Sequence, residues 1–182
     1  DKITAQTTLV GIEPSCILSF RDEYPDLVPA ELRSQAKELG CNSLLFDEFI
    51  VREVKAGHIS TEDFKSDAVE IWLHDHCHQK ALVGTEKTVA AFKLLQGAKI
   101  HVIPSGCCGM AGSFGYEKEH YQTSLAIREM ILFPTIRKAT EKANGVIPVI
   151  VSAPGTSCRQ QIKDGTGVHA VHPIEILYHW VK

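Results

Sequence analysis

The sequence predicts an α/β protein with a Rossmann-like parallel sheet flanked by helices. Short β-prone runs alternate with helical segments along the whole chain, which is the pattern of repeated strand–helix units. Residues 149–151 are apolar throughout, as is typical of strands covered on both faces. The chain has 182 residues, of which 44% are hydrophobic, so it can bury a core as one compact unit.

The first third of the chain is expected to form one strand and three helical segments, at residues 7–12, 17–23, 31–39 and 44–55. Pro25 and Pro29 separate the first two helical segments, because proline breaks a helix interior. Gly40 is expected to stop the second segment and Ser43 to cap the third. Residues 56–69 are polar and are expected to form a linker or surface excursion.

In the rest of the chain, strands are expected to alternate with helices. The expected strands are residues 68–73, 99–103, 146–152 and 169–171, and the expected helices are residues 80–95, 117–143, 158–163 and from 173 onward. Gly97 ends the first of these helices, and Pro134 predicts a break or kink in the second. Residues 104–115 form a glycine-rich turn between a strand and a long helix.

Cysteines follow directly after the predicted strands. Cys16, Cys77, the adjacent pair Cys107 and Cys108, and Cys158 all lie where a strand gives way to a helix. The carboxyl ends of parallel strands meet at one edge of a sheet, where functional sites collect. We therefore expect one edge of this sheet to be rich in thiols.

The glycine-rich turn holds the most informative residues, the adjacent Cys107 and Cys108. Neighbouring side chains leave the backbone in different directions, so both thiols cannot pack into one apolar core, and the pair indicates thiolate chemistry. Gly106 and Gly109 have no Cβ, so they let backbone N–H groups approach an anionic centre closely. An iron–sulfur cluster is such a centre.

Cys77, Cys107, Cys108 and Cys158 are the expected ligands, and only the fold can bring them together, because their spacing matches no local zinc motif. A zinc-stabilised interaction module remains an alternative, because His74, His76 and His78 alternate around Cys77. Among these histidines, His76 and His78 are the better candidate ligands, since they flank Cys77. A thiol–disulfide redox domain using Cys107 and Cys108 is the other alternative.

A short internal repeat is visible in the sequence. Residues 9–16 and 149–158 share one plan, a strand followed by proline, Ser-Cys and a helix, and each is followed by a later helix that contains a glutamate, Glu48 or Glu175. The prediction is a pseudo-repeat whose first copy is truncated. Residues 1–62 would be the remnant of the first copy and residues 63–182 the second copy, packed as one compact unit.

Composition limits the classes of partner and compartment. With 19 basic and 22 acidic residues the formal charge is −3, which gives no reason to expect nucleic acid. No apolar stretch reaches the roughly 20 residues that span a bilayer, and no signal peptide is visible at Asp1. Six cysteines without a disulfide framework favour a reducing compartment. We expect a cytoplasmic location, with any membrane association made through partners.

Three segments together resemble the cysteine-rich CCG domain family: residues 71–82 (IWLHDHCHQKAL), 105–119 (SGCCGMAGSFGYEKE) and 157–167 (SCRQQIKDGTG). Within that family the chain resembles the C-terminal iron–sulfur portion of FAD-linked oxidases of the D-lactate dehydrogenase and glycolate oxidase type, which are related to the CCG-containing component of heterodisulfide reductase. Residues 13–16 and 21–25 resemble the end of that family's first CCG repeat.

The resemblance implies that Cys77, Cys107, Cys108 and Cys158 bind a cluster of the 4Fe–4S kind, with Cys16 as a ligand of the first repeat. It implies electron transfer from a flavin-containing domain or subunit, acting on a 2-hydroxy acid such as lactate or glycolate, to a downstream acceptor. The chain would thus be part of an oxidoreductase and inactive when isolated. Two positions depart from the reductase pattern: Gly155 replaces the first cysteine of a Cys-x-x-Cys ending, and His76 replaces a proline.

Overall fold

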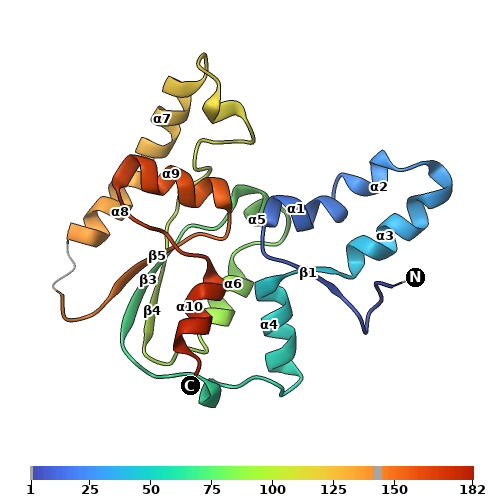
Figure 1. The fold of residues 1–182 in the computed structure, drawn as a ribbon, viewed down its shortest axis with the longest axis horizontal. Coiled ribbons are helices and arrows are strands. Elements are labelled where there is room, and N and C mark those ends of the chain that lie inside the picture. The colour runs from blue at the N-terminus through green and yellow to red at the C-terminus, as the bar shows by residue number, and fades with distance from the viewer. Residues whose placement is uncertain (1, 142–144) are drawn as a thin grey trace.

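A computed structural model describes residues 2–141 and 145–182. Within these residues the strands form two parallel sheets (Figure 1). The first sheet pairs β1 (Leu9–Gly11) with β2 (Ser43–Leu45), and the second has the order β4 (Ala98–Val102), β3 (Val69–Leu73), β5 (Val149–Ser152). The predicted α/β class with parallel strands and flanking helices is confirmed, although the strands are divided between two sheets.

The α-helices of the described residues are α1 (Pro14–Ile17), α2 (Tyr24–Leu27), α3 (Arg33–Cys41), α4 (Phe46–Lys55), α5 (Cys77–Leu82), α6 (Glu86–Phe92), α7 (Tyr121–Met130), α8 (Leu132–Glu141), α9 (Thr156–Thr166) and α10 (Pro173–Trp180). Short 3₁₀ helices occur at Leu18–Phe20, Ala30–Leu32, Thr61–Asp63 and Phe114–Tyr116. In Figure 1, α2 and α3 extend away from the three-stranded sheet, and α7 projects from another side of it.

The central strand β3 divides the core into two layers. Its alternate residues Val69, Ile71 and Leu73 are buried against α6 and α10, where Phe92 and Trp180 lie in the same cluster. Trp72 faces the opposite side and packs with the cluster that contains side chains of α8 and α9. Because side chains alternate along a strand, β3 presents one face to each helical layer.

The expected helix 44–55 starts two residues later, because residues 43–45 form the strand β2, which the sequence prediction missed. Ser43 pairs with Leu9, and its hydroxyl donates to the backbone oxygen of Leu39 (2.7 Å), so Ser43 does not cap α4. Gly40 does not stop the preceding helix, since α3 continues to Cys41. A Cβ at Gly40 would lie 2.5 Å from the backbone oxygen of Phe20, so this glycine permits close packing instead.

Other boundaries also differ from the prediction. The expected helix 80–95 is two helices, α5 and α6, separated by Gly84, whose φ of +77° does not fit a right-handed helix. The expected helix 117–143 is broken near Pro134, as predicted. The break is at Ile131, between α7 and α8, and Pro134 lies in the first turn of α8, where proline is tolerated. Residues 142–143 of that prediction lie outside the described residues. The expected strand 169–171 is reduced to one bridge between Val171 and Ser152.

The two proposed copies of the repeat share an order of elements. β1 and β5 are each followed by a cysteine-bearing helix, then by a residue or strand paired in parallel with them, and then by α4 or α10. The third residue of each closing helix is a glutamate: Glu48 accepts from the N–H of Leu45 (3.0 Å), and Glu175 from that of His172 (2.9 Å). In the first copy α2 and α3 also lie between α1 and β2, and the duplication stays a prediction.

Hydrogen bonds of Glu13 and His172 help to hold the N-terminal part against the part that bears the sulfur-rich edge. The carboxylate of Glu13 accepts from the backbone N–H and the hydroxyl of Thr156, both at 2.8 Å, at the start of α9. The Nδ1 of His172 accepts from the N–H of Ile174 (3.0 Å), so its Nε2 carries the proton that is donated to the oxygen of Ile12 (2.8 Å). The neutral form of His172 therefore serves both contacts.

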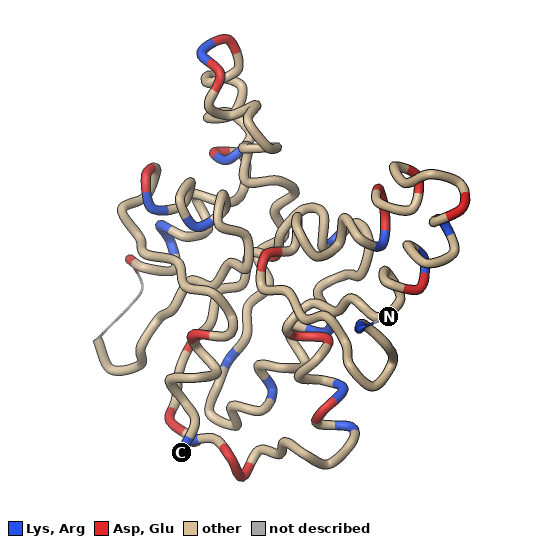
Figure 2. The backbone as a smooth tube through the Cα atoms, turned by 45° about the vertical axis from the view of Figure 1, so that its right-hand side comes forward, with Lys and Arg blue, Asp and Glu red and all other residues tan. Residues whose placement is uncertain are grey.

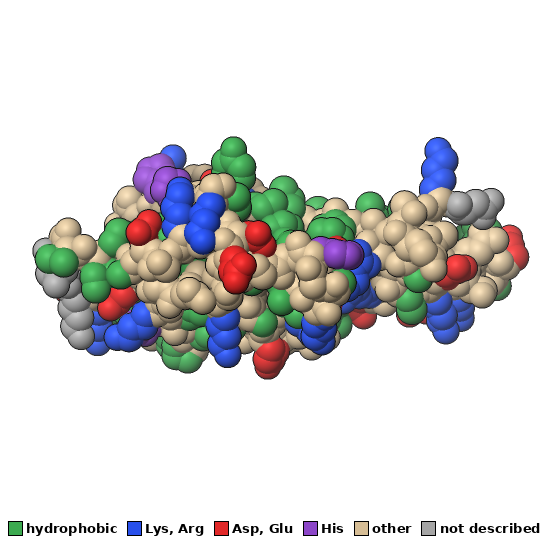
Figure 3. All heavy atoms as spheres, turned by 90° about the horizontal axis from the view of Figure 1, so that it is seen from below, with side chains coloured by type: hydrophobic (Ala, Val, Ile, Leu, Met, Phe, Trp, Pro, Cys, Tyr) green, Lys and Arg blue, Asp and Glu red, His purple; other side chains and the backbone are tan. Residues whose placement is uncertain are grey.

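Charge is dispersed over the fold. Basic and acidic residues are interspersed along the backbone in Figure 2, and charged side chains of both signs lie among apolar ones on the face shown in Figure 3. No helix among the described residues combines the length and apolar character needed to cross a membrane.

We expect His172 to make stability depend on pH. Burial lowers the pKa of His172, so the unfolded chain binds this proton more readily than the folded one. Stability therefore rises with pH through about 6.5 and is lost as the pH falls below that value. In H172N, asparagine keeps an acceptor for the N–H of Ile174 but does not titrate. Urea unfolding between about pH 7.5 and 5 should show a shallower loss in H172N; parallel curves would contradict this assignment.

Candidate metal centre

The structure brings the four predicted ligand cysteines to one edge of the three-stranded sheet. Cys77 begins α5 just after β3, Cys107 and Cys108 lie in the turn after β4, and Cys158 lies in the first turn of α9 after β5. Side-chain hydrogen bonding links Cys77 to Cys107, Cys107 to Cys108, and Cys108 to Cys158. All four are free thiols. The sulfurs thus form a continuous group, which we call the sulfur cluster.

The turn that holds Cys107 and Cys108 is fixed from two sides. Lys80 in α5 donates its Nζ to the backbone oxygens of Ser105 and Gly106, each at 2.5 Å. Gly109 has a φ of +91°, and a Cβ there would lie 2.5 Å from the oxygen of Ser124 in α7, so only glycine fits. The N–H of Gly109 donates to the sulfur of Cys107 (3.2 Å), which is the close backbone approach that the glycines predict.

The pKa values of the four cysteines shift in alternating directions along the sulfur cluster. Hydrogen bonding with Cys107 raises the pKa of Cys77 and of Cys108. Hydrogen bonding with Cys108 lowers the pKa of Cys107 and of Cys158, and the N–H of Gly109 contributes at Cys107. The shifts favour the thiolate form at Cys107 and Cys158 and the thiol form at Cys77 and Cys108. Thiolate is the form of cysteine that ligates metals.

A cavity of about 700 Å³ opens beside the sulfur cluster. Cys77, Cys107 and Cys108 line it, together with Glu13 and Ser15 from the N-terminal part. α9 and the exposed Tyr116 complete its wall. The cavity thus lies where the two parts of the chain meet, and it gives the sulfurs a space in which a ligand can be held.

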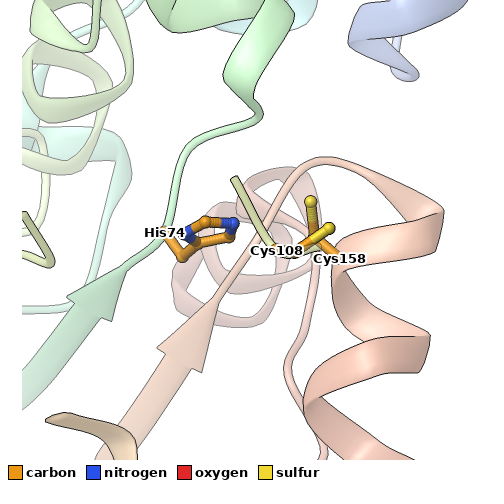
Figure 4. Close-up of side chains that lie close together, drawn as sticks. All are labelled: His74, Cys108 and Cys158. Carbon is orange, nitrogen blue, oxygen red and sulfur yellow. The ribbon is translucent and has the colours of Figure 1, made fainter. Parts of the chain in front are cut away.

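His74 is the site residue that the sequence prediction missed. Its side chain is fully buried, and its Nδ1 lies 2.7 Å from the hydroxyl oxygen of Ser105. Its Nε2 has no hydrogen-bond partner of ordinary geometry among the described residues, although interaction with the His74 side chain lowers the pKa of Cys158. Ligand atoms of His74, Cys108 and Cys158 all lie within 4.8 Å of one another. Figure 4 shows the His74 ring directed toward the two sulfurs.

The alternation of β3 could have identified His74. Trp72 lies on the face of β3 that packs with Cys108 and Cys158, and two residues later the same face is presented by His74. The sequence prediction instead weighed the three histidines by their nearness to Cys77 along the chain. In an extended segment, the face on which a side chain lies predicts its contacts better than its distance from Cys77 along the chain.

The two histidines that the sequence favoured do not enter the sulfur cluster. His76 caps α5, because its Nδ1 accepts from the N–H of His78 (3.2 Å), although its ring lines the cavity. The Nε2 of His78 lies 3.6 Å from Asp22 and belongs to a separate group with Asp22 and Glu23. Gly155 leaves space for His76, since a Cβ there would lie 2.5 Å from the Cδ2 of the ring.

The remaining cysteines are exposed. Cys16 lies in α1 and Cys41 ends α3, and neither belongs to a group of potential metal ligands within residues 2–141 and 145–182. Cys16 does follow a strand, as predicted, and its neighbour Ser15 reaches the cavity. Gly106, the other glycine expected near the centre, contributes its carbonyl to Lys80.

A buried carboxyl group lies next to the sulfur cluster along the chain. Asp75 is 1% exposed, and neither of its carboxyl oxygens has a hydrogen-bond partner among the described residues. Burial, followed by the charge of Asp47, raises the pKa of Asp75 to about 8. A protonated carboxyl at this position adds no negative charge to an edge where Cys107 and Cys158 favour the thiolate form.

Sequence comparison relates the chain to parts of dehydrogenases. It is 31% identical over 177 residues to D-2-hydroxyglutarate dehydrogenase of Escherichia coli K12, matching 96% of this chain but 16% of that protein. The enzyme of the same name from Pantoea ananatis is 32% identical over 171 residues, matching 93% of this chain and 15% of that protein. One subunit of the anaerobic glycerol-3-phosphate dehydrogenase of E. coli K12 is 28% identical over 169 residues, matching 93% of this chain and 39% of that subunit.

The chain therefore spans about one sixth of the D-2-hydroxyglutarate dehydrogenases and less than half of the glycerol-3-phosphate dehydrogenase subunit. No protein-family model matches it, and no solved structure matches it to a significant degree. The similarity relates nearly the whole chain, including all the cysteines of the sulfur cluster, to a portion of larger oxidoreductases.

We expect Lys80 to hold the cysteine turn in place. In K80M the carbonyls of Ser105 and Gly106 lose their charged donor, which should lower the free energy of unfolding by about 1–2 kcal/mol. The buried Cys108 should also react faster with a thiol reagent, followed by mass spectrometry. K93M, at an exposed lysine that follows α6, is the matched control and should change neither quantity. Equal labelling rates in K80M and the unmodified chain would contradict the assignment.

Proposed function

We propose that this chain is an electron-transfer domain in which Cys77, Cys107, Cys108 and Cys158 bind an iron–sulfur cluster. The observation that supports it most directly is the sulfur cluster itself, four free cysteines from three strand ends joined by hydrogen bonds. The need to fill the core does not explain this arrangement, because other apolar side chains could fill the same space. Soft thiolate ligands suit iron–sulfur clusters.

The residues present fit such a group. Cys107 and Cys158 already favour the thiolate form, and the N–H of Gly109 donates to the Cys107 sulfur, as expected around an anionic centre. The cavity provides open space next to three of the four cysteines. When bound, an iron–sulfur cluster accepts and releases single electrons. The protein's part is to hold the thiolates, to supply N–H donors and to limit solvent access.

The source of the electrons is proposed from the relatives. They are named as dehydrogenases, and this chain matches only a portion of each, so substrate oxidation belongs to other parts of such proteins. In line with the family resemblance, we place an FAD-containing domain or subunit upstream of the cluster and a further acceptor downstream. We infer a cytoplasmic location, with membrane association only through partners, and no activity of the 182 residues alone.

The substrate class is narrowed by the relatives' names. D-2-hydroxyglutarate is a 2-hydroxy acid, the class that the family resemblance implies, and the other relative is named for glycerol 3-phosphate. Neither name supports lactate or glycolate. We therefore propose a hydroxy acid or hydroxy phosphate as the substrate of the whole oxidoreductase.

One observation favours a second candidate, a zinc site. The close approach of His74, Cys108 and Cys158 is compact enough for a single tetrahedral ion. This candidate leaves Cys77 and Cys107, which interact with each other, without a shared role. Elemental analysis separates the two, because only the cluster contains inorganic sulfide.

The test is anaerobic reconstitution of the chain with iron and sulfide. We expect bound iron and sulfide together with visible absorption, and retention at least about tenfold lower in C77S, C107S, C108S and C158S, because each loses a thiolate ligand. C41S, at an exposed cysteine outside the sulfur cluster, is the matched control and should retain the full content. Tight zinc binding without sulfide would favour the second candidate, and uptake of neither metal would refute both.

A further inference from the structure

The two ring nitrogens of His74 differ in their hydrogen bonding. Its ring is fully buried, with Nδ1 at 2.7 Å from the Ser105 hydroxyl and Nε2 without a hydrogen-bond partner of ordinary geometry among the described residues. A buried polar atom without a well-formed hydrogen bond is costly, so this nitrogen calls for a function. The ring is directed toward Cys108 and Cys158 (Figure 4), whose sulfurs lie within 4.8 Å of its ligand nitrogen.

The Ser105 hydroxyl determines which ring nitrogen carries the proton. Ser105 is 7% exposed, and its hydroxyl has no second acceptor within residues 2–141 and 145–182. If Nδ1 donated to the hydroxyl oxygen, the hydroxyl proton would be buried without an acceptor. If the hydroxyl instead donates to Nδ1, the hydroxyl proton has an acceptor and none is left unsatisfied between Ser105 and Nδ1. The second arrangement leaves the proton of the neutral ring on Nε2.

We propose that His74 donates its Nε2–H to the sulfur of Cys158 and so acts as a positioning residue of the cluster site, not as a metal ligand. The proposal rests on the function proposed above. A nitrogen that carries a proton has no free lone pair for a metal, whereas it is the natural donor to an anionic sulfur. His74 thereby joins the line of donors and acceptors that runs through the four cysteines.

The contact has a consequence for redox chemistry. Reduction of a cluster by one electron increases the negative charge on its sulfurs, and a hydrogen-bond donor stabilises that charge. Hydrogen bonds to the sulfurs are among the factors that set the reduction potential of iron–sulfur clusters. Because His74 is fully buried, a leucine in its place would occupy most of the same space and supply no donor. His74 should therefore raise the potential of the centre.

The tautomer can be tested without any metal. In the metal-free chain labelled with ¹⁵N, long-range nitrogen–proton correlation spectra report which nitrogen of each histidine is protonated. We expect His74 to carry its proton on Nε2, and S105A to weaken this preference because the donor to Nδ1 is lost. A proton on Nδ1 of His74 in the unmodified chain would overturn the proposal.

The effect on the centre is tested in the reconstituted chain by redox titration followed by electron paramagnetic resonance. We expect H74L to keep its iron and sulfide but to have a lower midpoint potential. We expect H74Q, whose amide nitrogen can replace Nε2–H, to restore most of the shift. H58L, at a histidine whose side chain is 69% exposed on the surface, is the matched control and should change neither quantity.

Three results would overturn the role of His74: loss of iron in both H74L and H74Q, strong ¹⁴N coupling of a directly bound imidazole, or an unchanged midpoint potential in H74L. Failure of the proposed function gives a different result, since the unmodified chain would then take up no iron and sulfide. In that case the tautomer measured in the metal-free chain still decides whether His74 is a donor to Cys158.

Discussion

The parallel pairing of β3 with β4 and β5 is the constraint on which the site depends. These strands run in one direction, so their carboxyl ends release Cys77, the Cys107–Cys108 turn and Cys158 at the same edge. Residues that are far apart in the sequence become hydrogen-bonded neighbours without any local metal motif. The apolar layers on both faces of β3 stabilise this arrangement independently of a bound group.

Much of this arrangement was predictable, and the exceptions have physical reasons. Local sequence patterns predicted the alternation of strands and helices, including β1, β3, β4 and β5. They also placed each cysteine of the sulfur cluster after a strand and so predicted the thiol-rich edge. β2 was missed because its residues run directly into α4 and were counted as the start of that helix. His74 was missed because its role depends on the direction of its side chain and on the hydroxyl of Ser105, neither of which local spacing shows.

The pKa shifts at the site limit the repulsion between closely spaced thiolates while keeping two cysteines in the form that binds metals. Four adjacent thiolates would repel one another, and four neutral thiols would be poor ligands. The observed alternation, with lowered pKa values at Cys107 and Cys158 and raised values at Cys77 and Cys108, places donors between acceptors. The raised pKa of Asp75 acts in the same direction by keeping a further negative charge away.

The bond between Glu13 and Thr156 limits how small a self-sufficient version of this domain can be. Glu13 accepts from the first N–H of α9, the helix that bears Cys158, and its side chain also lines the cavity. A fragment trimmed to the second copy of the repeat would contain all four cysteines but would leave that helix end unsatisfied and one side of the cavity open to water. The smallest segment that keeps the proposed site intact is thus larger than the segment that contains the four cysteines.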